Sequence, residues 1–368
     1  RLAPSQHLGD ATEARPVTSG SNRVPPLSSD EPACHIETAP ALTSPPPTAA
    51  PIHIPLGDNV LYPLTLATGA TFLVDAGPDF AIDTSEAWPL LTAQLAAHSI
   101  ELGHVSHVLI THAHLDHAGL AHRWAAEGAA ILAGSADIPA IAAGQQSRET
   151  QRAAQLHDLI RHGCPEDLVL QMRSPRSGSP LRWEPCPAAS LSTPAVSYDL
   201  ADGRTLEVID APGHTPGNLV AFIPQTGELF SGDTILPTTV PTPGMHYPTA
   251  IATDGNSVES PERWPSLPPF VDSVAHIRTL APRRILPGHG EPVEQPETLF
   301  TRFETHHARR AKRIRRLLEE QPDSAFGIAR RQFPRLPPRR LAQAITETLG
   351  HLDLLAREGA LESFEEDG

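Results

Sequence analysis

The stretch Thr111-His112-Ala113-His114-Leu115-Asp116-His117-Ala118-Gly119 carries more chemical information than any other part of the 368-residue chain. It follows the apolar run 105–110, which is typical of a buried strand that delivers polar side chains into a loop. Alternate residues of an extended chain face the same way, so His112 and His114 are expected to converge on one point. Asp116 and His117 would turn toward a second point, at the start of the next helix. Imidazole and carboxylate together are ligands for zinc or another divalent first-row metal.

A chain with 19 histidines can form such a cluster by chance, so other motifs have to support this interpretation. Three further segments do so, because each is an apolar strand followed by a turn that presents one polar side chain. Glycines in these turns let the backbone take tight conformations. The segments 207–218, 229–234 and 284–290 present His214, Asp233 and His289, respectively.

The order and residue pattern of these motifs resemble those of the metallo-β-lactamase superfamily over about residues 55–295. A fifth motif, 71–77, resembles the early strand whose aspartate, here Asp75, supports the metal ligands. The resemblance implies an α/β protein with the αββα sandwich of that superfamily. It also implies two metal ions, one held by His112, His114 and His214, the other by Asp116, His117 and His289, with Asp233 bridging them.

Such a ligand set predicts hydrolysis. Two cations about 3.5–4 Å apart lower the pKa of a shared water and so supply hydroxide near neutral pH. That metal-bridged hydroxide would attack an electrophilic carbonyl or phosphorus centre. Asp116 is the carboxylate best placed to orient the nucleophile or to pass its proton to the leaving group, although a ligated carboxylate can also be purely structural. Zinc is the expected metal, with Mn²⁺ and Fe²⁺ as alternatives, because His/Asp sites accept all three.

Other features of the chain limit the alternatives. No Ser-His-Asp or Cys-His arrangement competes with the metal chemistry. Cys34, Cys164 and Cys186 lack CxxC spacing and are expected to be free thiols. The chain has no apolar run of about eighteen or more residues, so we expect no membrane span. Its first residues lack the basic-then-apolar pattern of a signal peptide, which favours a cytoplasmic protein.

Composition and periodicity divide the chain into three parts. Residues 1–50, rich in Pro, Ser, Thr and Ala, are expected to be disordered because they can bury little apolar surface. In the hydrolase domain, 51–295, strands and helices alternate as in a sheet covered by helices. We expect strands at 59–67, 71–76, 105–111 and 129–133, and helices at 85–98, at 118–127 and within 136–172.

Two long loops are expected to carry the substrate specificity, namely 173–195 and 237–263. A Pro/Ser-rich loop of this length is typical of a lid or of a segment without fixed structure. Trp183 in the first loop is a candidate to cover the site. The candidates for lining the substrate pocket near the second loop are His246, Tyr247 and Trp264.

Residues 296–368 form the third predicted part, a small helical domain. Helices are expected at 296–320, 324–333 and 341–357, followed by a short strand at 360–364. Three helices and a strand resemble the winged-helix extension of the β-lactamase-like-protein-2 branch of the superfamily. The segment 347–352 resembles the last helix of that extension, and its His351 is expected to pack between helices rather than to bind metal.

Two functions from different classes remain open. The first is hydrolysis of a small-molecule ester, thioester or lactone. The second is cleavage or regulation of nucleic acid through the basic region 301–340, which has twelve Lys/Arg against four Asp/Glu. The first is favoured because the whole chain carries a net charge of −15, which would repel a phosphodiester backbone, and because Arg309–Arg316 can be a solvated helix face. Oxygen chemistry at iron is a remote third option, and no feature of the sequence indicates an oligomeric state.

Overall fold

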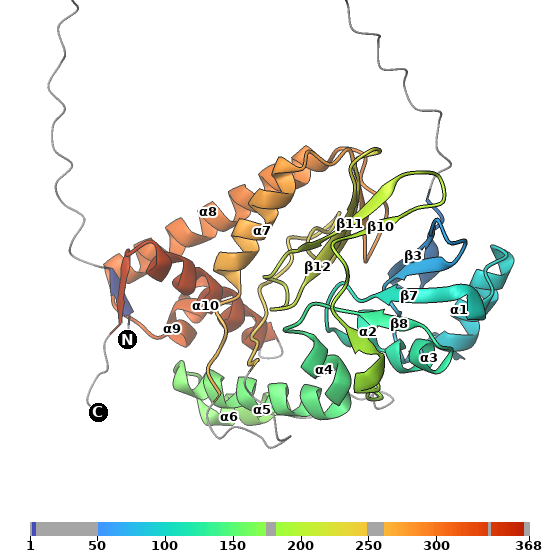
Figure 1. The fold of residues 1–368 in the computed structure, drawn as a ribbon. Coiled ribbons are helices and arrows are strands. Elements are labelled where there is room, and N and C mark those ends of the chain that lie inside the picture. The colour runs from blue at the N-terminus through green and yellow to red at the C-terminus, as the bar shows by residue number, and fades with distance from the viewer. Residues whose placement is uncertain (1, 5–50, 174–181, 249–260, 338–339, 364–368) are drawn as a thin grey trace, which may run out of the picture. The chain divides into compact units, whose positions relative to one another are not determined.

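The computed structural model describes residues 2–4, 51–173, 182–248, 261–337 and 340–363. Within these ranges two β-sheets pack face to face (Figure 1). The first has the strand order β2-β3-β4-β7-β8-β9 and the second the order β10-β11-β12-β13-β14. The strands are β2 (Ile54–Leu56), β3 (Asn59–Thr65), β4 (Thr71–Val74), β7 (Val105–Leu109), β8 (Ala130–Leu132), β9 (Leu191–Ser192), β10 (Ser197–Asp199), β11 (Thr205–Asp210), β12 (Leu219–Ile223), β13 (Glu228–Gly232) and β14 (Arg284–Pro287).

Alternation of side chains along the strands explains why the two sheets pack against each other. In β12, Leu219, Ala221 and Ile223 belong to the core between the sheets. Val220 and Phe222, which point the other way, belong to the core under the outer helices. Because successive side chains of a strand face opposite sides, a wholly apolar strand supplies both cores at once.

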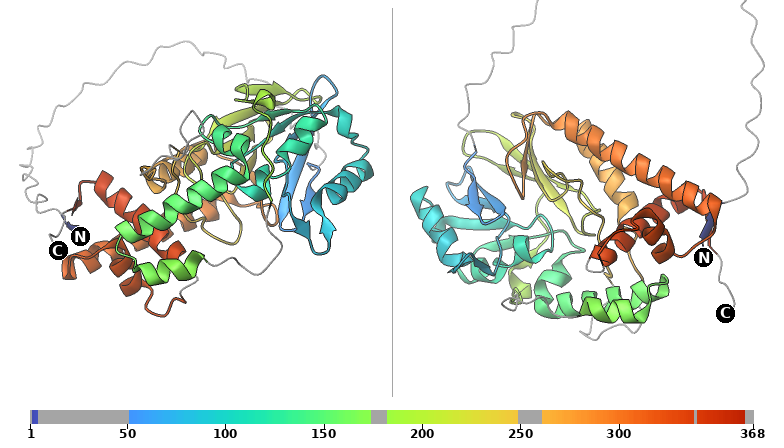
Figure 2. Two further views of the ribbon diagram at one scale, coloured as in Figure 1. Left: turned by 90° about the horizontal axis from the view of Figure 1, so that it is seen from below. Right: turned by 180° about the vertical axis from the view of Figure 1, so that it is seen from behind.

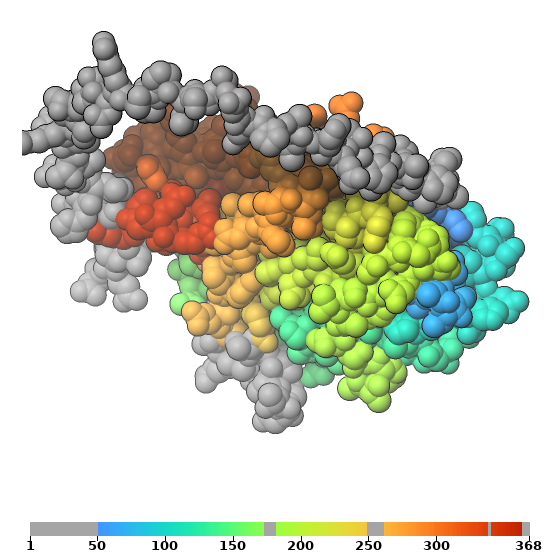
Figure 3. Space-filling view, turned by 45° about the horizontal axis from the view of Figure 1, so that its top comes forward, coloured from blue at the N-terminus to red at the C-terminus, as the bar shows by residue number. Residues whose placement is uncertain are grey.

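Helices cover the outer face of each sheet (Figures 1 and 2). On the first sheet, Leu91, Leu95 and Trp124 of the covering helices join the strand residues in one buried cluster. On the second sheet, Phe270 and Phe300 do the same. The space-filling view shows α7 in orange between the red C-terminal helix and the yellow-green strands (Figure 3). The αββα sandwich implied by the motifs is therefore confirmed.

The helices begin and end close to the expected positions, with two differences. The helix expected at 118–127 is split into α2 and α3, and the region 136–172 contains three helices. Strand β12 and helix α7 were not predicted. Every residue of β12 is buried, so this strand shows no alternation of apolar and polar residues. The helices are α1 (Ala87–Ala97), α2 (Leu115–Ala118), α3 (Ala121–Ala126), α4 (Ile138–Ala143), α5 (Gln145–Arg161), α6 (Glu166–Arg173), α7 (Leu267–Thr279), α8 (Pro296–Glu320), α9 (Ala325–Gln332) and α10 (Leu341–Arg357).

The C-terminal helices share a hydrophobic core with helices from the middle of the chain. The predicted apolar stripe of α10 is buried, and it packs with α8, α9 and with Leu156 and Leu159 of α5. We call this cluster the C-terminal core. His351 is fully buried between helices, as expected, and its Nε2 lies 3.1 Å from Nδ1 of His307. The domain boundary at 295 and the winged-helix resemblance stay predictions.

Short strands complete the described structure. Strand β15 (Leu361–Ser363) pairs antiparallel with β1 (Leu2–Pro4), and β5 (Ala81–Ile82) pairs with β6 (Ser85–Glu86). Strand β1 was not predicted, because so short a strand shows no periodicity. The remainder of the segment 1–50, which includes Cys34, lies outside the described residues.

Cys164 and Cys186 are free, as expected, and the structure shows that both are buried. None of the helices in the described ranges combines the length and the apolar character that a membrane crossing needs.

A matched pair of leucines tests the shared C-terminal core. Leu159 on α5 is 0% exposed in this core, whereas Leu170 on the adjacent α6 is 58% exposed. We expect Leu159→Ala to lower the free energy of unfolding by about 2–5 kcal/mol, because it leaves a cavity. The control, Leu170→Ala, should change it by no more than about 0.5 kcal/mol. Chemical denaturation followed by circular dichroism measures both, and equal effects would contradict the packing described above.

Candidate metal centre

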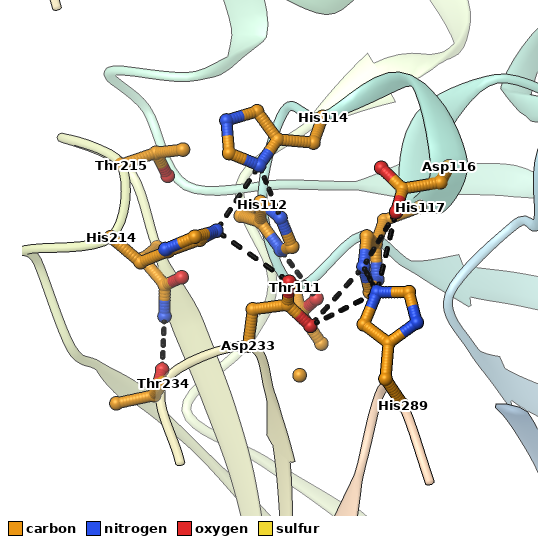
Figure 4. Close-up of polar contacts among 12 residues, drawn as sticks. Thr111, His112, His114, Asp116, His117, His214, Thr215, Asp233, Thr234 and His289 are labelled. Atoms are coloured by element: carbon orange, nitrogen blue, oxygen red, sulfur yellow. Dashed lines mark hydrogen bonds and ion pairs between the residues drawn. The ribbon is translucent and has the colours of Figure 1, made fainter. Parts of the chain in front are cut away.

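Loops at one end of the sandwich bring together all seven residues predicted to bind metal (Figure 4). Strands β4, β7 and β8 are parallel to one another, and β13 is parallel to β14. The carboxyl ends of parallel strands meet at the same edge, so the loops that follow them converge. His112 and its neighbours follow β7, Asp233 follows β13, His289 follows β14, and His214 lies in the turn between β11 and β12.

His112, His114 and His214 form the first group. Nδ1 of His114 lies 2.9 Å from Nε2 of His112 and 3.1 Å from Nε2 of His214. The other ring nitrogen of His112 lies 3.1 Å from Oγ1 of Thr111, whose hydroxyl donates to Asp75 at 2.8 Å. Since this hydroxyl donates elsewhere, Nδ1–H of His112 donates to it and Nε2 keeps its lone pair. The three ring nitrogens thus face one point.

Asp116, His117 and His289 form the second group. Nε2 of His117 lies 3.2 Å from Nε2 of His289, and Oδ2 of Asp116 lies 3.3 Å from Nε2 of His289. The outer nitrogens are held in place, since Nδ1 of His117 donates to Asp75 at 2.7 Å and Nδ1 of His289 donates to the carbonyl of Asp58 at 2.9 Å. Both Nε2 atoms are therefore directed into the centre.

Asp233 lies between the two groups. Its Oδ2 is 3.7 Å from Nε2 of His214, and its Oδ1 is 3.4 Å from Nε2 of both His117 and His289. Close packing on this side requires glycine at position 288, where a Cβ would approach Oδ1 of Asp233 to 3.0 Å and Cε1 of His117 to 2.6 Å. The carboxylate thus occupies the bridging position that the motifs implied.

Asp75 lies outside both groups and helps to hold each of them in place through hydrogen bonds. Its carboxylate accepts hydrogen bonds from the amide of Thr111 at 2.8 Å and from Nδ1 of His117 at 2.7 Å. Its φ is +66°, in the left-handed region, where Asp is tolerated better than most residues. The supporting role predicted for Asp75 is consistent with these contacts.

The electrostatics of the two groups differ. Burial lowers the pKa of His214 to about 3, and burial with the neighbouring imidazoles lowers the pKa of His112 well below its usual value. In the second group burial also acts to lower the pKa of each histidine, but the carboxylates outweigh it. Asp75 and Asp233 raise the pKa of His117 well above its usual value, and the nearby carboxylates of Asp116 and Asp233 raise the pKa of His289 to about 10.

These observations fit divalent cations. Three sets of three ligand atoms each lie within 4.8 Å of one another, and together these sets include all seven predicted residues. Oδ1 of Asp233 is buried and accepts no hydrogen bond from the described residues. A cation would satisfy this oxygen and the facing imidazole lone pairs, and would displace protons from the second group. Outer hydrogen bonds that fix the ring orientation are also typical of metal-binding histidines.

Asp137, after β8, was not predicted as a site residue from the sequence. It is 3% exposed, and it accepts hydrogen bonds from the amide of Ala113 at 2.8 Å, the hydroxyl of Thr215 at 2.6 Å and the amide of Gly217 at 2.8 Å. These donors belong to the loop of His112 and His114 and to the turn of His214. One buried carboxylate therefore ties together the two loops of the first group. A lone Asp without a motif offers no signal of this role.

The predicted pocket residues have different positions. Trp183 is 5% exposed and packs in the core beneath the first sheet, so its predicted position over the site is wrong. Tyr247 is 1% exposed and packs in the C-terminal core, so it is not a pocket residue either. His246 does lie beside the site, with its ring centroid 6.3 Å from that of His114. Trp264 packs edge-on against His246 at 6.3 Å.

The role of Asp137 can be tested by an isosteric change. Both carboxylate oxygens accept from a backbone N–H, so the amide group of Asp137→Asn meets a donor in either orientation. We expect this variant to bind Zn²⁺ about 10–100-fold more weakly in a competition titration, because the two loops separate. Asp167→Asn on α6, where the residue is exposed, is the control and should bind zinc normally. Unchanged affinity in Asp137→Asn would show that the loops hold their positions without this carboxylate.

Comparisons with known proteins agree with this geometry. A family model described as "Metallo-beta-lactamase superfamily" matches residues 64–289, more than half of the chain. "Probable metallo-hydrolase YqjP" of Bacillus subtilis (strain 168) is 28% identical over 321 residues, which cover 85% of this chain and 92% of that protein. "Beta-lactamase-like protein 2 homolog" of Drosophila melanogaster is 26% identical over 163 residues, or 44% of this chain and 48% of that protein.

A solved structure is similar over a comparable share of the chain. The metallo-beta-lactamase family protein TTHA1429 from Thermus thermophilus has a TM-score of 0.59 and 26% identity, and the match covers 84% of this chain and 92% of that one. The sandwich, the convergent His/Asp loops and the extent of the family match lead to one conclusion. The chain belongs to the metallo-beta-lactamase superfamily.

Proposed function

We propose that this chain, a metallo-hydrolase of the metallo-beta-lactamase superfamily, hydrolyses a small-molecule ester, thioester or lactone. The observation that carries the proposal is the complete set of convergent ligands, in which both groups and the bridging Asp233 are present. The name of the Bacillus relative, "Probable metallo-hydrolase YqjP", supports the reaction class, and the match covers 92% of that protein. Zinc is the metal we propose, because His/Asp sets of this kind are common zinc ligands.

Divalent cations held by the two groups would supply Lewis acidity for the scissile carbonyl and would lower the pKa of water. The residues of the chain prepare this centre. Outer hydrogen bonds to Asp75, Thr111 and Asp58 fix the orientation of three of the imidazoles. Such fixed orientation means that little reorganisation is needed when charge develops on the substrate.

Asp116 is the carboxylate that substrate and water can reach. Its side chain is 33% exposed, compared with 12% for Asp233 and 4% for Asp75. Burial acts to raise the pKa of Asp116, but the hydrogen bond from His289 and the nearby His117 hold this pKa well below its usual value. Asp116 is therefore ionised at neutral pH, and we assign it the task of orienting the attacking water and relaying its proton.

The second candidate, a nucleic-acid hydrolase, is favoured by one observation. A groove of about 630 Å³ on α8 is lined by threonines and by basic residues, among them Arg302, Arg309, Arg310 and Arg313. Most of these guanidinium groups are already engaged. Arg302 donates to backbone carbonyls after β13, Arg310 pairs with Glu347 at 2.6 Å, and Arg313 donates to the carbonyl of Gln332. Engaged cations attract phosphates weakly, so we keep the small-molecule hydrolase as the proposal.

A hydrolysis panel tests the proposal. The metal-replete protein should hydrolyse at least one class among thioesters, aryl esters and lactones, and should lose this activity on chelation. Asp116→Asn that retains its metal, as measured by mass spectrometry, should lower kcat by about 10²–10⁴-fold, because it removes the proton relay. Asp167→Asn on α6 is the matched control for loss of one carboxylate.

Two results would contradict this proposal. Near-normal turnover by metal-replete Asp116→Asn would remove the assigned role of that residue. Cleavage of short RNAs, with no turnover of the panel and with loss of cleavage when Arg309 and Lys312 are replaced by Gln, would establish the second candidate instead.

A further inference from the structure

One imidazole beside the centre is not part of either ligand group. His246 lies in the segment after β13, with its ring 6.3 Å from the ring of His114 at an interplanar angle of 29°. Its Nε2 lies 2.7 Å from the carbonyl oxygen of His214. His246 thus flanks the first group, whose members His114 and His214 are drawn in Figure 4.

The tautomer of His246 follows from this contact. A carbonyl oxygen only accepts, so Nε2 of His246 carries the proton and donates it to His214. In a neutral imidazole the nitrogen without a proton keeps its lone pair, so Nδ1 of His246 is an acceptor. Among the residues that the structure describes, no hydrogen bond reaches Nδ1, and the side chain is only half-buried. The residue therefore offers a free hydrogen-bond acceptor beside the centre.

The C-terminal core holds His246 in this position. Its neighbours Met245 and Tyr247 are 8% and 1% exposed and both pack in that core, on the side opposite to His246. Alternation along an extended segment accounts for this arrangement, because burial of both neighbours turns His246 toward the metal centre. Glycine at position 244 leaves room for this ring orientation, since a Cβ there would lie 2.0 Å from Nε2 of His246.

Polar contacts fix the same segment to α5. The side-chain amide of Gln151 pairs with both the N–H and the carbonyl of Tyr247, at 2.9 and 2.8 Å. The hydroxyl of Tyr247 donates to the buried Asp158 at 3.0 Å. Arg263 lies 3.8 Å from the same carboxylate and binds Asp353 of α10 through two hydrogen bonds of 2.6 and 2.8 Å. Helices α5 and α10 therefore determine where His246 lies.

We propose that His246 contacts the substrate, and that its Nδ1 selects compounds with an O–H or N–H donor next to the scissile ester or thioester bond. This inference rests on the proposed hydrolase function. In this proposal the C-terminal helices position a specificity-determining residue, His246, at the metal centre.

The test uses two pairs of substrates that differ only in one hydrogen-bond donor. Phenyl glycolate and phenyl methoxyacetate differ on the acyl side, and S-acetyl-N-acetylcysteamine and its N-methyl derivative differ in the leaving group. The wild-type protein should prefer the donor-bearing member of at least one pair by about tenfold in kcat/KM, as expected for one neutral hydrogen bond.

Three variants test whether His246 contacts the substrate or only supports His214 through its hydrogen bond. His246→Gln can still donate to the carbonyl of His214 but has no acceptor at the position of Nδ1, so it should lose the preference while keeping its metal. Tyr247→Phe, which releases the anchor on Asp158, should weaken the preference. The matched control is His276→Gln on α7, where the residue is exposed, and it should behave as wild type.

The outcomes are distinguishable. Absence of turnover of all four compounds and of the wider hydrolysis panel by the wild type would overturn the proposed function itself. Turnover without a preference, or a preference that survives in His246→Gln, would overturn only the assignment of His246. Long-range ¹H–¹⁵N spectra of the histidine rings give a readout independent of activity: Nε2 of His246 should be protonated and Nδ1 unprotonated, and the reverse would contradict the proposal.

Discussion

The close approach of seven imidazole and carboxylate groups at one end of the sandwich is the constraint on which the rest of the structure depends. Nδ1 of His114 lies 2.9 Å from Nε2 of His112 and 3.1 Å from Nε2 of His214, which are hydrogen-bond distances. Lone pairs and charges at such separations are costly to bury unless something compensates them. Buried carboxylates and hydroxyls outside the two groups, together with the cations that we propose inside them, would provide the compensation.

Two carboxylates organise this cluster from outside. Asp75 accepts from Thr111 and His117, and Asp137 accepts from the loops that carry His112, His114 and His214. Each joins segments that are distant in sequence, so the geometry of the ligands is set before a metal arrives. The C-terminal core influences the centre indirectly. Tyr247 packs in this core, and its fixed position directs the adjacent His246 toward the metal centre.

The sandwich and the convergence of all seven candidate ligands could be predicted from the sequence, because each of them follows an apolar strand. Asp137 could not, since a single Asp after a strand looks like an ordinary turn residue. Trp183 and Tyr247 were expected at the site, whereas both are buried in hydrophobic cores. Long loops carry little periodicity, so the side that each of their residues faces is decided by packing with distant helices. The pairing of β1 with β15 depends in the same way on contacts between segments far apart in the sequence.

The central claim is that two divalent cations are gathered by the seven side chains. Metal analysis of the purified full chain by inductively coupled plasma mass spectrometry tests it most directly, with His214→Ala as the comparison. We expect about two equivalents of metal in the wild type and about one in the variant, which keeps only the second group intact. A wild-type protein without bound metal, or a stoichiometry that His214→Ala leaves unchanged, would contradict the account.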